Sequence, residues 1–130
     1  MSIDFQTSEK ANYLLISCRG SFNNKALLNV YEKAFDIAEN QGFRSIIVDI
    51  TDLELEGFSP TTRERYDHGV TFAQIQLKHD RRIFMGLVGK EPIIDQQKFG
   101  ETIAINRGAH CKVFTNFIDA VGWLERNDLN

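Results

Sequence analysis

The sequence predicts an α/β fold: a five-stranded, mixed but mostly parallel β-sheet covered by four helices. Two observations predict it. Some segments carry apolar residues at helical spacing and others are short β-branched runs, and the two kinds alternate after an initial pair of strands. Strands that alternate with helices pair in parallel through right-handed crossovers, each of which places a helix against a sheet face. The expected element order is ββαβαβαβα, with one antiparallel strand at the edge.

The first elements are a hairpin and a helix. Residues 3–7 alternate apolar and polar side chains, residues 8–12 supply turn chemistry, and residues 13–18 continue as a second strand. Residues 21–24 offer capping side chains for a helix, and Gly42 is a suitable stop at its end. The residues of this helix that recur at core spacing are Leu27, Val30, Tyr31, Ala34, Phe35 and Ala38.

Residues 45–50, Ser-Ile-Ile-Val-Asp-Ile, are the expected central strand. A nearly continuous β-branched run is typical of a strand that is covered on both faces. The next helix is expected to begin near Pro60, with the Ser59 hydroxyl as its cap. Gly69 weakens this helix slightly. The residues expected on its core face are Tyr66, Val70, Ala73 and Leu77.

The C-terminal part of the chain repeats the alternation. A strand at residues 82–88 leads into a third helix, which is expected to carry Pro92 in its first turn and to end near Gly108. Residues 111–115 are the last expected strand. Asn116 is placed to cap the final helix.

Length and composition narrow the function classes. The chain of 130 residues fits one domain, residues 1–130, and can bury about two thirds of its unfolded surface without metal or disulfide support. The formal net charge of -3 and the lack of a Lys/Arg run argue against nucleic-acid binding. No apolar run approaches the roughly 20 residues of a membrane-spanning helix. The chain begins without a secretory signal pattern, so we expect a cytoplasmic protein.

The titratable residues show no catalytic or metal-binding pattern. The histidines share no metal-ligand spacing. His110 and Cys111 are neighbours on a strand and point to opposite faces, which makes them a poor base and nucleophile. Cys18 and Cys111 are expected to be separate buried thiols in a reducing compartment. We therefore expect no metal, no cofactor and no enzymatic activity.

The element order and two strand segments resemble the STAS superfamily, in particular its SpoIIAA-like branch. The segments are Ile-Ile-Val-Asp-Ile-Thr-Asp-Leu at residues 46–53 and Arg-Ile-Phe-Met-Gly-Leu-Val-Gly at residues 82–89. The resemblance implies a SpoIIAA-like sandwich and a regulatory, non-enzymatic protein-interaction module. In the related anti-sigma-factor antagonists, a serine or threonine at the start of the helix after the central strand is phosphorylated by a partner kinase.

The positions nearest to that phosphorylation site are Ser59, Thr61 and Thr62. The antagonists usually carry an aspartate before the modified residue and a small residue after it. In this chain Phe58 precedes Ser59 and Pro60 follows it. The usual phosphosite motif is therefore lacking.

The segment at residues 51–58 is expected to be an acidic loop at the carboxyl end of the central strand, where α/β domains present functional groups. Its apolar residues either fold back against the next helix or form a patch for a partner protein. The candidate docking residues are Leu55, Glu56, Phe58 and Arg63.

Lys90 is a candidate anion contact. It follows a strand and precedes the expected third helix, whose first amides would lie beside it. A simple turn explains the same residues, because Gly89 and Pro92 flank Lys90 and Glu91.

A carrier of a small apolar or lipid-like ligand is the alternative function. Ten phenylalanines, three tyrosines and Trp123 are generous for this length, and aromatic residues between helix and sheet can line an apolar pocket. The SEC14 lipid-binding domains are related to the resembled superfamily. Self-association into a homodimer through an apolar helix face is a further expectation.

Overall fold

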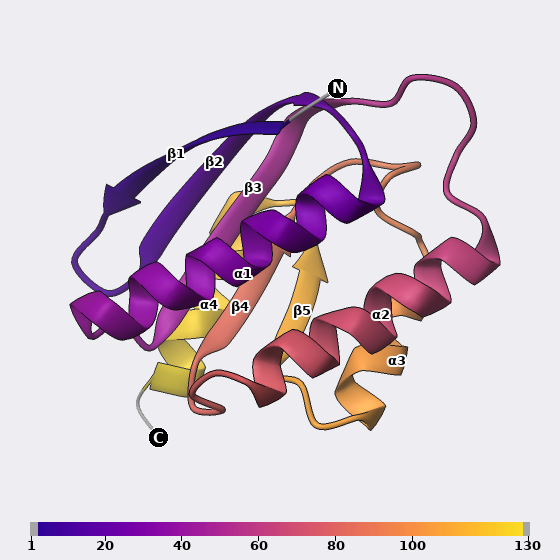
Figure 1. The fold of residues 1–130 in the computed structure, drawn as a ribbon. Coiled ribbons are helices and arrows are strands. Elements are labelled where there is room, and N and C mark those ends of the chain that lie inside the picture. The colour runs from indigo at the N-terminus through magenta and orange to yellow at the C-terminus, as the bar shows by residue number, and fades with distance from the viewer. Residues whose placement is uncertain (1–2, 129–130) are drawn as a thin grey trace.

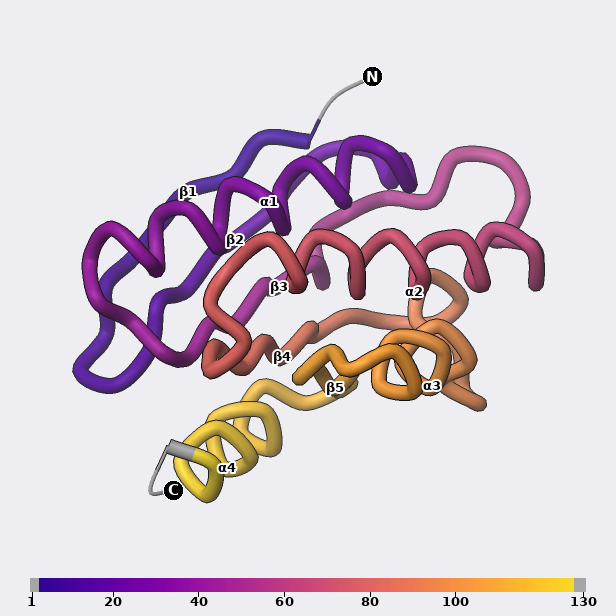
Figure 2. The backbone as a smooth tube through the Cα atoms, turned by 60° about the horizontal axis from the view of Figure 1, so that its bottom comes forward, coloured from indigo at the N-terminus to yellow at the C-terminus, as the bar shows by residue number. Residues whose placement is uncertain are grey.

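The computed structural model describes residues 3–128, which form three layers (Figure 1). Helices α1, α2 and α3 cover one face of a five-stranded sheet, and α4 covers the other, as Figure 2 also shows. In chain order the elements are β1 (Ile3–Glu9), β2 (Leu14–Ser21), α1 (Asn24–Gln41), β3 (Ser45–Glu54), α2 (Thr62–Leu77), β4 (Phe84–Val88), α3 (Phe99–Asn106), β5 (Cys111–Phe114) and α4 (Phe117–Asp128).

The sheet has the strand order β1-β2-β3-β4-β5. β1 pairs antiparallel with β2, and all other neighbours are parallel. The predicted element order and the mixed, mostly parallel sheet are confirmed. Among residues 3–128, no helix is long and apolar enough to cross a membrane.

β3 separates the two cores of the molecule. Ile46, Val48 and Ile50 pack with α1 and α2 in the larger core, whereas Ile47 packs with α4 in the smaller one. Successive side chains of a strand point to opposite faces, so a run of apolar residues feeds both cores. The predicted central strand is therefore confirmed, and it continues to Glu54.

α1 matches its prediction closely. Its first turn is capped by Asn23, whose side chain accepts a hydrogen bond from the Ala26 amide at 2.9 Å. Gly42 ends the helix in the left-handed conformation with φ of 80°, where a glycine avoids the Cβ clash. All six residues predicted for its core face are buried. Cys18 and Cys111 are free thiols, as expected, but only Cys18 is fully buried and Cys111 is partly buried. Removal from water raises the pKa of each to about 12.

The start of α2 differs from the prediction. Thr61 is the cap residue: its hydroxyl accepts from the Glu64 amide at 3.1 Å, and the Glu64 carboxylate accepts from the Thr61 amide at 2.8 Å. The prediction that Ser59 caps this helix was wrong. Glu64 stands three residues after Thr61 and can return the hydrogen bond, whereas the residue three positions after Ser59 is a threonine.

The predicted core face of α2 was also wrong in part. Tyr66 and Leu77 are exposed, and Gln76 is buried. The Gln76 amide donates to the Ile83 carbonyl at 2.7 Å and accepts from the His110 amide at 2.9 Å. Because the buried residue Gln76 is polar, the spacing of apolar residues alone identifies the wrong face of the helix as buried.

The third helix begins later than predicted, at Phe99, so Pro92 lies in an irregular segment instead of a first helical turn. The Asp95 carboxylate accepts hydrogen bonds from the Gln97 and Phe99 amides and organises the turn that precedes α3. The cap of the last helix agrees with the prediction, because the Asn116 side chain accepts from the Asp119 amide at 3.2 Å.

Gly69 marks the closest approach between α2 and α3. A Cβ at this position would lie 2.5 Å from the Gly100 carbonyl oxygen and 2.9 Å from the Ile103 Cβ. Neither atom lies at the far end of a flexible side chain, so neither can easily move away. Gly69 therefore allows the two helices to pack, which outweighs its low helix propensity.

We predict that Gly69→Ala lowers the free energy of unfolding by about 1–3 kcal/mol, because the added methyl pushes α3 away from α2. Urea unfolding measures the change. The matched control is Gly122→Ala in α4, where a Cβ would meet the Arg126 guanidinium at 3.5 Å. That variant should equal or exceed the wild type by up to about 1 kcal/mol. Equal stability of the two variants would contradict the packing role.

Candidate functional site

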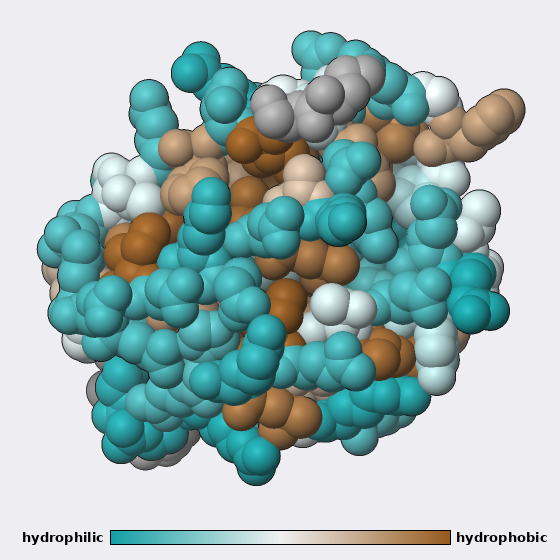
Figure 3. Space-filling view, in the orientation of Figure 1, coloured by the Kyte–Doolittle hydropathy of each residue, from teal (hydrophilic) through white to brown (hydrophobic). Residues whose placement is uncertain are grey.

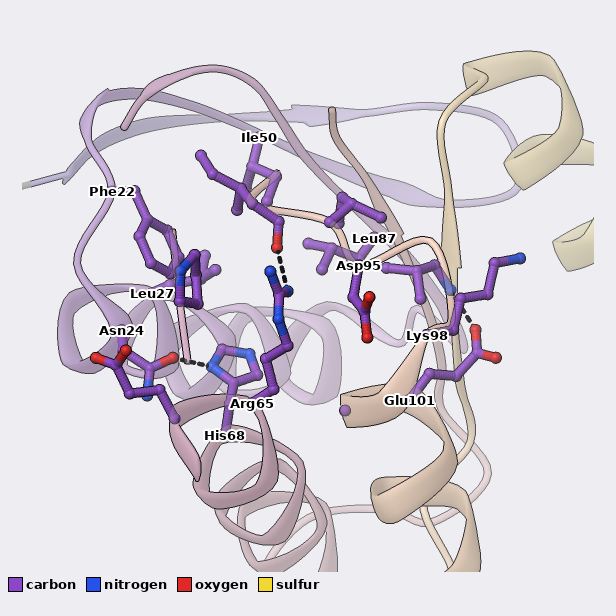
Figure 4. Close-up of a pocket in the computed structure, with 16 residues that line it drawn as sticks. Phe22, Asn24, Leu27, Ile50, Arg65, His68, Leu87, Asp95, Lys98 and Glu101 are labelled. Carbon is purple, nitrogen blue, oxygen red and sulfur yellow. Dashed lines mark hydrogen bonds between the residues drawn. The ribbon is translucent and has the colours of Figure 1, made fainter. Parts of the chain in front are cut away.

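A small cavity lies at the carboxyl ends of β3 and β4 (Figure 4). Its volume is about 90 Å³, and the start of α1, the first half of α2 and the segment before α3 enclose it. A second cavity of about 60 Å³ is lined by residues of α2, α3, β4 and β5, and it shares His68, Leu87, Gly100, Glu101 and Val113 with the first. The walls are mainly apolar, and the polar residues that line the first cavity are Asn24, Glu64, Arg65, His68, Asp95, Lys98 and Glu101.

His68 projects from α2 toward the larger cavity (Figure 4). Its Nδ1 contacts the Asn24 side-chain oxygen, and its Nε2 lies 3.0 Å from the Tyr31 hydroxyl. The oxygen of Asn24 only accepts, so Nδ1 carries the proton and Nε2 accepts from Tyr31. Burial, with a smaller effect of the Arg65 charge, lowers the His68 pKa to about 4. The ring is therefore neutral near pH 7.

Arg65 attaches the segment after β4 to α2. Its guanidinium donates to the Ile93 carbonyl at 2.9 Å and to the Pro92 carbonyl at 2.7 Å. A planar guanidinium presents parallel donors, so two successive carbonyls are held by one side chain. The Arg65 side chain thus positions one wall of the cavity.

The carboxylates of the cavity also bond to the backbone. The Asp95 carboxylate accepts a hydrogen bond from the Phe99 amide at the start of α3, and the Glu101 carboxylate accepts one from the Val113 amide of β5 at 2.6 Å. Arg65, His68 and Glu101 were not identified as site residues from the sequence. Their partners lie from 12 to 44 positions away in the chain, so no local motif signals them.

The cavities bear on the alternative of an apolar-ligand carrier. Binding pockets for small molecules usually enclose about 300–1,000 Å³. Cavities of about 90 and 60 Å³ are too small for a lipid chain. The carrier function stays a prediction, and these two cavities do not favour it.

Of the predicted docking residues, Leu55, Glu56 and Phe58 lie on the connection from β3 to α2, and Arg63 lies in the first turn of α2. All four are at the same end of the sheet as the cavity. Phe58 is 96% exposed, so it does not fold back against the helix. Leu55 is half-buried, and Glu56 and Arg63 are exposed. Arg63 pairs with Asp67 at 3.3 Å one helical turn away. The connection is shorter than the predicted loop, because residues 51–54 belong to β3.

The three predicted hydroxyls have different surroundings. Thr61 is the α2 cap described above, Thr62 is the first helical residue, and both are exposed. Ser59 is exposed and precedes the cap. Lys90 is also exposed, but α3 begins at Phe99, so the predicted contribution of helix amides beside Lys90 was wrong.

His79 joins the turn after α2 to α1. Its Nε2 lies 2.6 Å from Glu32 and its Nδ1 2.7 Å from Glu39, and the ring stacks on Phe35. Burial lowers the His79 pKa, but the hydrogen bonds to Glu39 and Glu32 outweigh it, so the net pKa is raised. The ligand atoms of Asp36, Glu39 and His79 lie within 4.8 Å of one another. An ion-pair network explains this group, and the expected absence of a metal stays a prediction.

We predict that Thr61→Ala lowers the free energy of unfolding by about 1 kcal/mol, because the Glu64 amide loses its capping oxygen. Ser59→Ala should change it by less than about 0.5 kcal/mol, since the Ser59 hydroxyl caps nothing. Chemical denaturation of both variants measures the difference. A larger loss for the serine variant would restore Ser59 as the cap.

We predict that His68→Leu costs about 1–3 kcal/mol of unfolding free energy, because it leaves the buried Tyr31 hydroxyl without a partner. Tyr31→Phe added to this variant should restore part of the loss. A double-mutant cycle of the two substitutions measures their coupling by urea unfolding. Additive effects would show that the Tyr31 hydroxyl does not depend on His68.

No protein-family model matches the sequence, and no curated protein sequence matches it. Solved structures do match. An anti-sigma factor antagonist from Mycobacterium paratuberculosis is 13% identical, with a TM-score of 0.61 over 95% of each chain. An uncharacterised protein with a SpoIIAA-like fold from Shewanella loihica is 19% identical, with a TM-score of 0.52 over 95% of this chain and 93% of that chain. Together with the element order, these matches show that the chain has the SpoIIAA-like fold.

Proposed function

We propose that the protein is a non-enzymatic regulatory module that binds a partner protein through residues 55–63, which we term the docking segment. The observation that carries the proposal is the 96% exposure of Phe58. Phe58 lies on a short connection at the carboxyl ends of the parallel strands, where α/β folds place their contacts with other molecules.

The energetics favour Phe58 as an anchor. Burying a phenylalanine side chain against a partner contributes about 1.5–3 kcal/mol. Gly57, with φ of 91°, adopts a turn conformation that places the aromatic side chain in water at the tip of the connection. An exposed aromatic on a surface that is otherwise largely hydrophilic (Figure 3) is typical of a contact residue.

Glu56 and Arg63 flank this anchor with charges of opposite sign. Charged groups at the rim of an interface select partners and orient them more than they add affinity. The Arg63 side chain pairs with Asp67 one turn along α2 and remains exposed to solvent.

The likeness to a solved anti-sigma factor antagonist supports a regulatory role carried out by protein binding. The internal cavity supports the non-enzymatic part of the proposal. Its histidine, arginine and two of its carboxylates bond to other groups of the chain and serve as structural ties. Phosphorylation is not required by the proposal, since Thr61 caps α2 and bulky residues flank Ser59.

We predict that Phe58→Ala and Leu55→Ala together weaken binding of the native partner by about tenfold or more, with only a small drop in melting temperature from the loss of the half-buried Leu55 side chain. The measurement is isothermal titration with the partner, once it has been isolated from the native host by cross-linking to the wild-type protein. The matched control is Ile118→Ala on α4, which removes another apolar side chain, 78% exposed, from a different surface. Undiminished binding by the double variant would reject the docking segment.

A further inference from the structure

β3 extends beyond its neighbour β4. Pairing between β3 and β4 ends at Asp49 and Val88, whereas pairing between β2 and β3 continues to Ser21 and Glu54. None of residues 50–54 pairs with β4. Asp52, Leu53 and Glu54 pair with β2, and Ile50 and Thr51 lie at a bulge between the paired stretches. In the part of the chain that the structure describes, no strand follows them on the other side.

A groove of about 410 Å³ runs along this free edge. Residues 50–55 form one wall, and Lys90, Glu91, Pro92 and Ile93 form the other. Arg65 holds the second wall by its bonds to the Pro92 and Ile93 carbonyls, so the groove is set by packed elements on both sides.

Backbone groups of β3 face the groove. The Glu54 carbonyl accepts from the Phe22 amide at 2.8 Å and thus points to the β2 side. Adjacent residues of a strand direct their backbone groups to opposite sides, so the amide and carbonyl of Leu53 point to the groove. The Thr51 amide is bonded by the Asp49 carboxylate at 3.0 Å, where β3 carries one extra residue relative to β2.

The groove is acidic. Asp52, Glu54 and Glu91 line the groove, and Lys90 is the one basic residue among its lining residues. Glu56 adds another negative charge directly after Leu55, where the first wall ends. Acidic side chains beside a free edge repel a second copy of the same edge, which protects the protein from edge-to-edge association. The same charges attract a strand that carries lysine or arginine.

We propose that this edge binds an extended, positively charged segment of a partner protein, which adds to the sheet as a strand beside β3. The proposal rests on the proposed function and specifies the chemistry of the partner. Backbone hydrogen bonds to β3 supply affinity, and alternate basic side chains of the segment meet the acidic rim. Residues 50–54 span about 17 Å, so about five residues of the segment make contact.

The test is a selection of random peptides of about twelve residues, displayed on phage, against the immobilised full chain. We expect enriched peptides with lysine or arginine at alternate positions. Synthetic copies are then N-methylated at one backbone amide at a time and titrated by fluorescence anisotropy. A paired strand loses about tenfold or more in affinity at alternate positions and little at the others.

Charge reversal locates the site. Glu54→Lys with Glu91→Lys should weaken the selected peptides by about tenfold or more, because the rim becomes basic. The matched control is Glu125→Lys, an exposed charge reversal on α4. Peptides without basic enrichment, an N-methylation profile without alternation, equal binding by the reversed variant, or no selected peptide at all would each overturn the proposal.

The outcomes separate the two proposals. If the native partner ignores Leu55 and Phe58 while basic peptides still bind the β3 edge, the docking segment fails and the edge site stands. If the partner needs Phe58 and the peptide results are negative, the edge site fails alone.

Discussion

The burial of β3 on both faces is the constraint on which the other elements depend. Ile46, Val48 and Ile50 contact the helices of one layer and Ile47 contacts α4. A strand with apolar side chains on both faces is removed from water only when helices cover each side of the sheet. Because of this requirement, the helices that connect the parallel strands lie against the faces of the sheet. The carboxyl ends of β3 and β4 then meet at the edge where the cavity and the docking segment lie.

The helical layer above β3 is held by close contact and by polar ties. Gly69 lets α2 approach the Gly100 backbone, and Gln76 bonds to the backbone before β4 and before β5. Arg65 donates hydrogen bonds to two backbone carbonyls of the loop after β4. A buried polar group that lacks its partner is costly, so each tie specifies one arrangement of α2. Arg65 and His68, which line the cavity, are held by such bonds to other groups of the chain.

The surface available for binding lies outside the cavity. The capping box at Thr61 and Glu64 fixes where α2 begins, and the preceding residues therefore remain in the connection, with Phe58 in water. The extension of β3 past β4 leaves a strand edge beside the same connection. Loops that are positioned by a rigid scaffold often carry contacts with other molecules, and this end of the sheet combines packed strands with an exposed connection.

The order of elements, the central strand and the whole core face of α1 follow from the sequence alone, because they depend on local periodicity and turn residues. The sequence left open whether Phe58 packs against the next helix or lies in water. The true cap of α2, its buried face, the late start of α3 and the cavity residues did not follow from it. The cap of α2 is a local choice, because only Thr61 has a glutamate three residues later that returns the hydrogen bond. Gln76, Arg65 and His68, in contrast, are held by hydrogen bonds to partners from 7 to 44 positions distant. Such long-range hydrogen bonds exist only after the layers pack, so the tertiary structure decides them.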